Sequence, residues 1–286
     1  MSAARSAATG VLWLITTVLL AAALPAMWVQ ANLVDRAGYA ALAESAAGDP
    51  QLQSAIATEL TAQVGRLSPA ADSTLVSTIA KTYTAGSSFP PQFAKANDFA
   101  HRWLFTDSVQ SGVDGQGRWV IDFAPMLSDA AFAQTLRDYS ITIPTALPIP
   151  LTDTAPAALR PGALRVYGMW TPWVSWGLAA LTAAAALLTL YAARRRGKTL
   201  AALGISALLV GAAGWGAIEF GRRYAEAALD DNTSGNLRRV ADVMVAVAQS
   251  SMHQWLNLTL VIGGGLVIVG VIVSLLASLA KNPVQK

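Results

Sequence analysis

The chain has 286 residues, 54% of them apolar and 13% charged, against roughly 25% charged residues in typical soluble proteins, which indicates an integral membrane protein. It contains no cysteine and two histidines, which excludes disulfides, thiolate metal sites, cysteine nucleophiles and a histidine-rich metal site. Seven of the 20 Lys and Arg fall in short segments that contain no acid and that we expect on the cytoplasmic side: Arg5, Arg194, Arg195, Arg196, Lys198, Lys281 and Lys286. The remaining 13 face 17 Asp and Glu, so the basicity follows the topology and predicts no nucleic-acid partner.

Residues 1–31 are predicted to form an N-terminal transmembrane anchor. Val11–Val29 is a run of 19 uncharged residues, about 28 Å as a helix, close to the ~30 Å hydrocarbon core of a bilayer. A cleaved signal peptide is the alternative, because Val29-Gln30-Ala31 resembles a cleavage site. The apolar region of such peptides is usually about 7–15 residues long, which favours a retained anchor.

Residues 32–169 are predicted to form an exported, mainly helical domain of the α+β type. Helices are expected over Asp35–Ala47, continuing from the anchor, from Asp49-Pro50 onwards, over Asp72–Thr84 and from Pro90-Pro91 onwards. Asp49 is expected as an N-cap followed by proline, and apolar residues recur at helical spacing in the segments that follow Asp49 and Asp72. In the last of these helices, Asn97 and His101 lie one turn apart. We expect them to tie this helix to the small β-hairpin that follows.

The hairpin is predicted where the apolar period changes. Val109–Val113 and Trp119–Phe123 flank Asp114-Gly115-Gln116-Gly117, a glycine-bearing turn. Ser128 is expected to cap a short helix over Asp129–Tyr139. Five prolines between Pro144 and Pro161 predict an extended return towards the membrane.

Residues 170–220 are predicted to form a transmembrane hairpin, with spans over Val174–Ala192 and Leu200–Phe220. Its turn carries Arg194, Arg195, Arg196 and Lys198, and loops this short and basic stay on the cytoplasmic side. Tyr167, Trp170, Trp173 and Trp176 lie around the start of the first of these spans at a spacing of three. We expect an aromatic belt at the outer membrane surface made by these residues with Trp28, Trp215 and Trp255, and Trp13 near the inner surface.

Residues 221–254 are predicted to form an external helical hairpin with a turn at Asp230–Gly235. An apolar-to-small stripe on its second helix, made by Leu237, Val240, Met244, Val247 and Ser251, predicts packing under the exported domain. Residues 255–286 contain the fourth span, Leu256–Leu279, and a cytoplasmic tail. Both termini are therefore expected in the cytoplasm.

Small residues in the last two spans predict close helix contacts. Ala207 and Gly211 have small-xxx-small spacing, and Gly263, Gly264 and Gly265 are consecutive. We expect leucine at Gly211 or Gly264 to release a partner protein.

Polar candidates for chemistry are few. His101 with Asp98 or Asp122 and a serine is a catalytic arrangement without any supporting motif, so a hydrogen-bonded structural histidine is favoured. Glu219, at the outer edge of a span, is expected to pair with Arg222 or Arg223. The sequence predicts no cofactor.

Two stretches carry a resemblance. Phe93–His101 (FAKANDFAH) and Gly117–Pro125 (GRWVIDFAP) resemble a pattern in actinobacterial four-pass membrane proteins of unknown function, which share the outline of anchor, exported domain and three further spans. The resemblance implies an actinobacterial, mycobacterial-type plasma membrane and assigns no catalytic residue. Mycobacterial envelope machines, including the Mce-type lipid importers, carry accessory membrane subunits of comparable outline.

We therefore expect a non-enzymatic accessory or scaffold subunit of a cell-envelope membrane complex, one that handles lipids. The alternative is a sensor or regulator whose exported domain binds a ligand and which signals through a partner. A membrane enzyme or transporter is disfavoured, because it would need ionisable groups at mid-span, whereas Glu219 is peripheral.

Overall fold

The computed structural model describes residues 2–67, 69, 72–106, 112–113, 119–122, 148–150, 162–232 and 235–279. Within these residues the chain is almost entirely helical. Four helices are long and apolar enough to cross a membrane: Ala7–Val34, Arg165–Ala192, Arg196–Arg222 and Arg238–Leu279. The prediction of a mainly helical chain with four candidate membrane spans is confirmed.

The chain divides into two compact units. The first unit consists of Met1–Gln30, Thr171–Ala225 and Gln249–Lys286, and the second of Ala31–Trp170 and Glu226–Ala248. The predicted domain boundaries near residues 31 and 170 lie close to these divisions.

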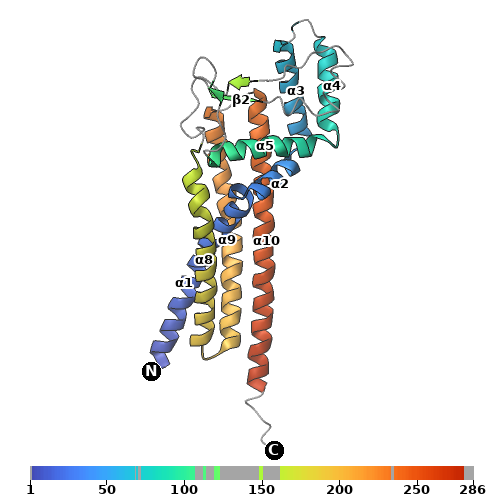
Figure 1. Cartoon of the computed structure of the whole chain (residues 1–286). Coiled ribbons are helices and arrows are strands. Elements are labelled where there is room, and N and C mark those ends of the chain that lie inside the picture. The colour runs from blue at the N-terminus through green and yellow to red at the C-terminus, as the bar shows by residue number, and fades with distance from the viewer. Residues whose placement is uncertain are drawn as a thin grey trace, which may run out of the picture. The chain divides into compact units, whose positions relative to one another are not determined.

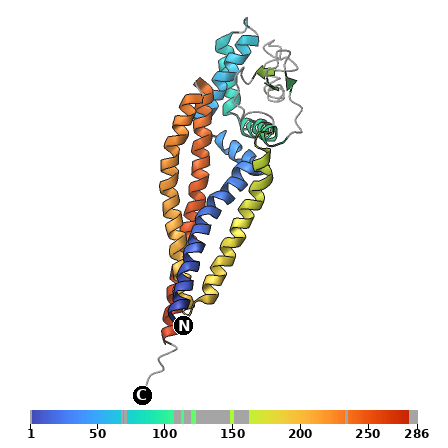
Figure 2. The same ribbon diagram turned by 90° about the vertical axis from the view of Figure 1, so that its left-hand side faces the viewer.

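Four long helices build the first unit and run alongside one another (Figures 1 and 2): α1 (Ser2–Val29), α8 (Arg165–Ala192), α9 (Arg196–Asn232) and α10 (Gly235–Leu279). Hydroxyl groups join α1 to two of its neighbours. The Thr16 and Thr189 oxygens lie 3.3 Å apart and link α1 to α8. The Thr17 and Ser206 oxygens lie 2.7 Å apart and link α1 to α9. Such bonds satisfy polar side chains that lipid would leave without partners.

Helix α10 is a single helix of 45 residues. The sequence predicted an external helix over Asn236–Gln254 and a separate span from Leu256, but nothing interrupts the helix between them. Met252, His253 and Gln254 are compatible with continued helix, so the apolar boundary marks a change of surroundings and not a change of backbone.

Aspartate side chains cap three helices of the second unit, and the sequence predicted this cap for Asp49. Asp35 accepts a hydrogen bond from the backbone N–H of Gly38 before α2 (Arg36–Ala46). Asp49 accepts from Gln51 N at 2.7 Å before α3 (Pro50–Leu67), and Asp72 accepts from Thr74 N and Leu75 N before α4 (Ser73–Ala85). These caps satisfy N–H groups that a helix start leaves without partners. Helix α5 (Phe89–Phe105) completes the set.

The core of the second unit forms where α3 packs beside α4 and α2 beside α5 (Figure 1). Leu52, Phe89 and Phe93 are buried in it, and α10 contributes Val243. Val240, Met244 and Val247 pack against the same core. The predicted stripe on residues 236–254 therefore contacts this helical domain.

A short three-stranded sheet belongs to the second unit. Strand β2 (Trp119–Asp122) pairs antiparallel with β1 (Gly112–Val113) and with β3 (Pro148–Pro150). Two of the three strands fall in the segments predicted to form the hairpin. Its turn at residues 114–117 and the helix expected over Asp129–Tyr139 lie outside the described residues.

A five-residue π-helix, η1 (Gln30–Val34), joins α1 to α2. The backbone comes so close to itself here that a Cβ on Gly38 would overlap the carbonyl oxygen of Ala31. Only glycine fits at position 38 without a backbone shift. The sequence predicted a helix continuing from the anchor but not this change of winding.

The tryptophans differ in their surroundings. Trp170, Trp173 and Trp176 are exposed on α8, with Trp173 at 76%, as a belt predicts. Trp28 is buried instead, and its Nε1 donates to the Ser251 hydroxyl at 3.2 Å. Trp28 therefore packs within the helix bundle and not on its exposed surface, and its level near the outer membrane surface stays a prediction.

Candidate functional site

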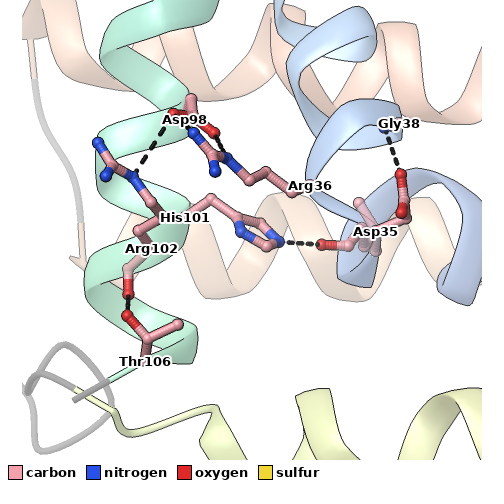
Figure 3. A network of polar contacts seen from close by, with 8 residues as sticks. Asp35, Arg36, Gly38, Asp98, His101, Arg102 and Thr106 are labelled. Atoms are coloured by element: carbon pink, nitrogen blue, oxygen red, sulfur yellow. Dashed lines mark hydrogen bonds and ion pairs between the residues drawn. The ribbon is translucent and has the colours of Figure 1, made fainter. Parts of the chain in front are cut away.

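Three charged or polar side chains one turn apart on α5 face the segment formed by η1 and α2 (Figure 3). Asp98 accepts hydrogen bonds from Nε and Nη2 of Arg36, the latter at 2.7 Å. Arg102 lies on the same carboxylate, with its Nε 3.5 Å from Asp98 Oδ2. The two-point contact between Arg36 and Asp98 fixes both planes, which a lysine could not do.

His101 is 6% exposed. Its Nε2 lies 3.1 Å from the carbonyl oxygen of Leu33 in η1, and because a carbonyl only accepts, Nε2 is the donor. Its ring stacks on Phe105 with centroids 4.4 Å apart and packs against Tyr39 at 5.2 Å. A buried ring held on both faces is a structural histidine.

Asn97 accepts a hydrogen bond from the Tyr39 hydroxyl of α2 at 3.3 Å. Across elements, Asn97 therefore contacts α2 and His101 contacts η1, because α5 packs along α2. The side chains of the predicted hairpin lie outside the described residues, so its contact with Asn97 and His101 stays a prediction. A catalytic arrangement of His101, Asp98 and a serine also has no support here. Asp98 binds Arg36, and the Nε2 atom of His101 donates to a backbone carbonyl oxygen.

Pairing with arginine lowers the pKa of Asp98. The hydrogen bond from Arg36 is the main cause that holds the pKa of Asp98 below its usual value, and the positive charges of Arg36 and Arg102 act the same way. Partial burial opposes them. Burial raises the pKa of Tyr39, so its hydroxyl stays protonated and can donate to Asn97.

A cleft of about 510 Å³ opens beside this network. It is lined by Val34, Arg36, His101, Arg102, Phe105, Thr106, Arg165, Gly168 and Met169. Three of these residues are arginines and none is acidic. Apolar side chains, among them Val34, Phe105 and Met169, line the cleft together with the arginines.

The other polar candidates lie apart from this cleft. Glu219 binds Arg222 at 3.0 Å, one helical turn away and exposed, which agrees with the predicted ion pair at the edge of a span. Asp122 lies on β2, and its side chain is outside the described part of the chain. Among the described residues, no group of three His, Asp or Glu could hold a metal ion.

The small-residue candidates divide into two groups. Gly211 meets Leu260 of α10, since a Cβ there would lie 2.7 Å from the Leu260 Cδ2 atom. Ala207 is buried, and a Cβ on Gly263 would lie 3.0 Å from the Cβ of Ala207. Gly264 and Gly265 have no atom within 4 Å of an added Cβ. Ala207, Gly211 and Gly263 thus pack α9 against α10 inside the chain. Gly264 and Gly265 face open space.

The basic turn between α8 and α9 is exposed at Arg194, Arg195, Arg196 and Lys198, whereas Gly197 is buried. A Cβ on Gly197 would lie 2.6 Å from the backbone nitrogen of Ser274 in α10. The turn is thus closed by a contact with α10, which sequence spacing did not indicate.

An apolar cavity of about 540 Å³ lies within the first unit, between α1, α9 and α10. Its lining includes Ala21, Pro25, Ala213, Gly214 and Ala217. The cavity exists because the side chains at these positions are too small to fill the space between the three helices. Every lining residue except Thr17 is apolar, so the cavity offers no chemistry.

Sequence reasoning missed the charged cleft. Asp98 and Arg102 are four residues apart, which is the usual spacing of an ion pair on a helix surface. Their spacing therefore does not indicate a site. Arg36 and Arg165 come from distant segments, and no local pattern brings them to α5. No family model matches the chain, and no curated protein or solved structure matches it, so the resemblance to actinobacterial proteins stays an expectation.

Proposed function

We propose that the protein is a non-enzymatic accessory subunit of a larger membrane complex in the cell envelope. The arginine turn lies on the cytoplasmic side, both termini are cytoplasmic, and the second unit lies outside. This orientation rests on the exposed cations Arg194, Arg195, Arg196 and Lys198, because short basic loops remain in the cytoplasm.

The proposal rests on helix α10, which packs in both units of the chain. Val243 of this helix is buried in the core of the second unit. Further along, Gly263 and Gly270 bring α10 into backbone contact with α9. One continuous helix therefore belongs both to the helical domain and to the membrane-crossing bundle, an arrangement suited to holding parts of an assembly together.

The side of α10 that faces away from α9 offers a partner surface. Val261, Gly264, Gly265, Ile268 and Ile272 share this side at helical spacing. The three large residues are exposed, with Val261 at 71%, and the two glycines have open space before them. Helices associate in lipid where small residues let backbones approach, so we name these five residues the open face and assign it to a partner helix.

The test is copurification of the full chain from its native membrane in mild detergent, followed by chemical crosslinking and mass spectrometry. Gly264→Leu places a bulky side chain on the open face and should release the partner while leaving expression and melting unchanged. Gly177→Leu is the matched control, because Gly177 of α8 also has open space but lies off the open face. Equal crosslinking of one defined partner by both variants would contradict the open face, and absence of any stoichiometric partner would contradict the accessory role.

The charged cleft favours a second candidate, a regulator whose external domain binds a ligand and signals through a partner. Arg36, Arg102 and Arg165 give that cleft its cationic character. The two candidates differ in which residues matter to the cell. A regulator loses its response when Arg165 is neutralised, whereas a scaffold loses its partner when Gly264 is enlarged.

A further inference from the structure

We propose that the apolar cavity between α1, α9 and α10 binds one acyl chain of a membrane phospholipid. The cavity has a volume of about 540 Å³, which lies in the usual range of sites for drug-sized ligands. The inference does not depend on the accessory role, because it concerns a cavity within the first unit and not the open face of α10.

The cavity lies among membrane-crossing segments. Every residue that lines it belongs to a candidate span of α1, α9 or α10, so the material around it is the hydrocarbon of lipid chains. Ala21 and Pro25 of α1 and Ala213 and Ala217 of α9 are exposed, whereas Leu256 of α10 is buried. The cavity is therefore closed at α10 and open along α1 and α9, where a lipid chain can enter.

The polarity of the lining disfavours water and polar ligands. Among the lining residues that the structure describes, Thr17 carries the only polar side chain. Its hydroxyl donates to the carbonyl oxygen of Trp13 at 2.9 Å and lies 2.7 Å from the hydroxyl oxygen of Ser206. An ordered water needs two to four polar partners, and a hydroxyl that is already bonded on both sides does not supply them.

An empty cavity of this size is also disfavoured. Protein interiors are packed about as densely as organic crystals, with few voids larger than a water molecule. Atoms that line an unfilled space lose their dispersion contacts on that side. A hydrocarbon chain restores these contacts and demands no hydrogen bond, so it suits this lining better than any other molecule that a membrane offers.

Two hydrogen bonds between helices mark the ends of the cavity along α1. Thr17 joins α1 to Ser206 of α9. Beyond the last lining residue of α1, Trp28 Nε1 donates to the Ser251 hydroxyl of α10 at 3.2 Å. About three helical turns, or roughly 16 Å, separate Thr17 from Trp28. One leaflet contributes roughly half of the ~30 Å hydrocarbon core, so the cavity has the length of a chain from one leaflet.

The helix contacts identify that leaflet. Gly197 of the arginine turn lies against Gly270 of α10, and Gly214 further along α9 lies against Leu256. Helices α9 and α10 are therefore antiparallel, and the lining residues 209–218 and Leu256 lie at the same level. This level is away from the arginine turn, so the acyl chain belongs to a lipid of the leaflet on the opposite side from that turn.

The experiment counts the lipids bound to the full chain by native mass spectrometry after delipidation. Digitonin micelles are used, because the apolar part of digitonin is a rigid ring system and not a linear chain. The probes are phosphatidylglycerol, the diacylglycerol with the same acyl chains, and glycerophosphoglycerol, which is the headgroup without chains. We expect saturable binding of one phosphatidylglycerol or one diacylglycerol, and no binding of glycerophosphoglycerol, because the cavity contacts only the chain.

Filling the cavity should remove this binding. Ala213→Leu on α9 should weaken it at least about tenfold, because the added carbon atoms occupy the space of the chain and overpacking is unfavourable. Ala21→Leu should do the same from α1. Ala212→Leu and Ala22→Leu are the matched controls, since each replaces an exposed alanine that is the direct neighbour of a lining alanine and lies outside the lining. Both controls should bind lipid like the unchanged protein.

All four alanines are exposed, so the variants should fold, and equal melting temperatures check this. Equal weakening by Ala213→Leu and Ala212→Leu would mean that the lipid binds elsewhere on the bundle. Binding of glycerophosphoglycerol, or of phosphatidylglycerol without diacylglycerol, would show a headgroup site. Any of these results, or lipid binding that never saturates, would overturn the proposal.

Discussion

Gly204 of α9 and Gly263 of α10 lie backbone against backbone: a Cβ on Gly204 would lie 2.6 Å from the Gly263 carbonyl oxygen, and one on Gly263 would lie 2.9 Å from the Gly204 carbonyl oxygen. Gly197 and Gly270 repeat this contact seven residues away on each helix, with a Cβ on Gly270 2.7 Å from the Gly197 oxygen. The seven-residue spacing keeps both glycine rows on one side of their helices. In a membrane the hydrophobic effect does not favour contact between helices over contact with lipid. Close packing at these glycines therefore supplies the attraction between α9 and α10.

Adjacent glycines on α10 provide a matched test of this contact. Gly263→Ala should destabilise the bundle by about 1–3 kcal/mol, because the new methyl group would lie 2.9 Å from a backbone oxygen and force the helices apart. Gly264→Ala should leave stability unchanged or raise it by up to about 1 kcal/mol, since the position is open and alanine favours helix. Unfolding of both variants by SDS titration in micelles measures the difference. Equal destabilisation would mean that α9 and α10 do not meet through Gly263.

The second unit allows a similar comparison at the π-helix. Gly38→Ala should lower the melting temperature of the protein, because its Cβ would overlap the Ala31 carbonyl oxygen and the backbone would have to move. Gly65→Ala in α3 is the control, since nothing lies within 4 Å of its added Cβ and alanine should stabilise the helix by about 0.5–1 kcal/mol. Thermal unfolding followed by circular dichroism distinguishes them. A Gly38→Ala protein as stable as the Gly65→Ala protein would show that the chain does not wind tightly at η1.

Asp98 should make the stability of the second unit depend on acid. Its pKa is lowered in the folded chain, first by the hydrogen bond from Arg36, so the folded state binds this proton less readily than the unfolded chain does. The contribution is therefore complete above the unfolded value of about 3.9 and is lost as pH falls through the lower folded pKa. Thermal midpoints of the full chain, measured from neutral pH downwards, should drop below about pH 4.

Asp98→Asn tests the assignment, because an amide cannot ionise. The variant should be less stable at neutral pH and should lose part of the decline below about pH 4. An unchanged acid profile in Asp98→Asn would assign the decline to other carboxylates.

The helices and their starts were predictable because their signals are local. Asp35, Asp49 and Asp72 each cap a helix. The sequence predicted the cap at Asp49, whereas Asp35 and Asp72 only marked where helices begin. The four spans follow from unbroken apolar runs that nearly match a bilayer. Local chemistry decides both features, so one sequence is enough to find them.

The use of the small residues was not predictable in the same way. Spacing showed that Gly211, Gly263 and Gly264 could each support a close contact, but not whether the contact lies inside the chain or outside it. Gly263 and Gly264 are neighbours, yet one faces α9 and the other faces open space. A rotation of α10 by one residue would exchange them, and only packing of the whole bundle fixes that angle.

The charged cleft escaped prediction for a related reason. Arg36, Asp98 and Arg165 are separated by more than 60 residues from one another in the chain. Charged residues scattered along helices most often face solvent, so the sequence gives no reason to group these three. The packing of α2 on α5, and the backbone bonds from Gly162 and Leu164 to α5, bring them together.

We propose that the arginine turn and the second unit lie on opposite sides of the membrane. The chain has no cysteine, so single cysteines report one position each. Lys81 on α4 and Arg195 in the turn are both exposed, and Arg195→Cys leaves Arg194, Arg196 and Lys198 in place. An impermeant maleimide added to intact spheroplasts should label Lys81→Cys and should label Arg195→Cys only after the membrane is opened. Labelling of Arg195→Cys on intact spheroplasts, with Lys81→Cys protected, would contradict the orientation and the account built on it.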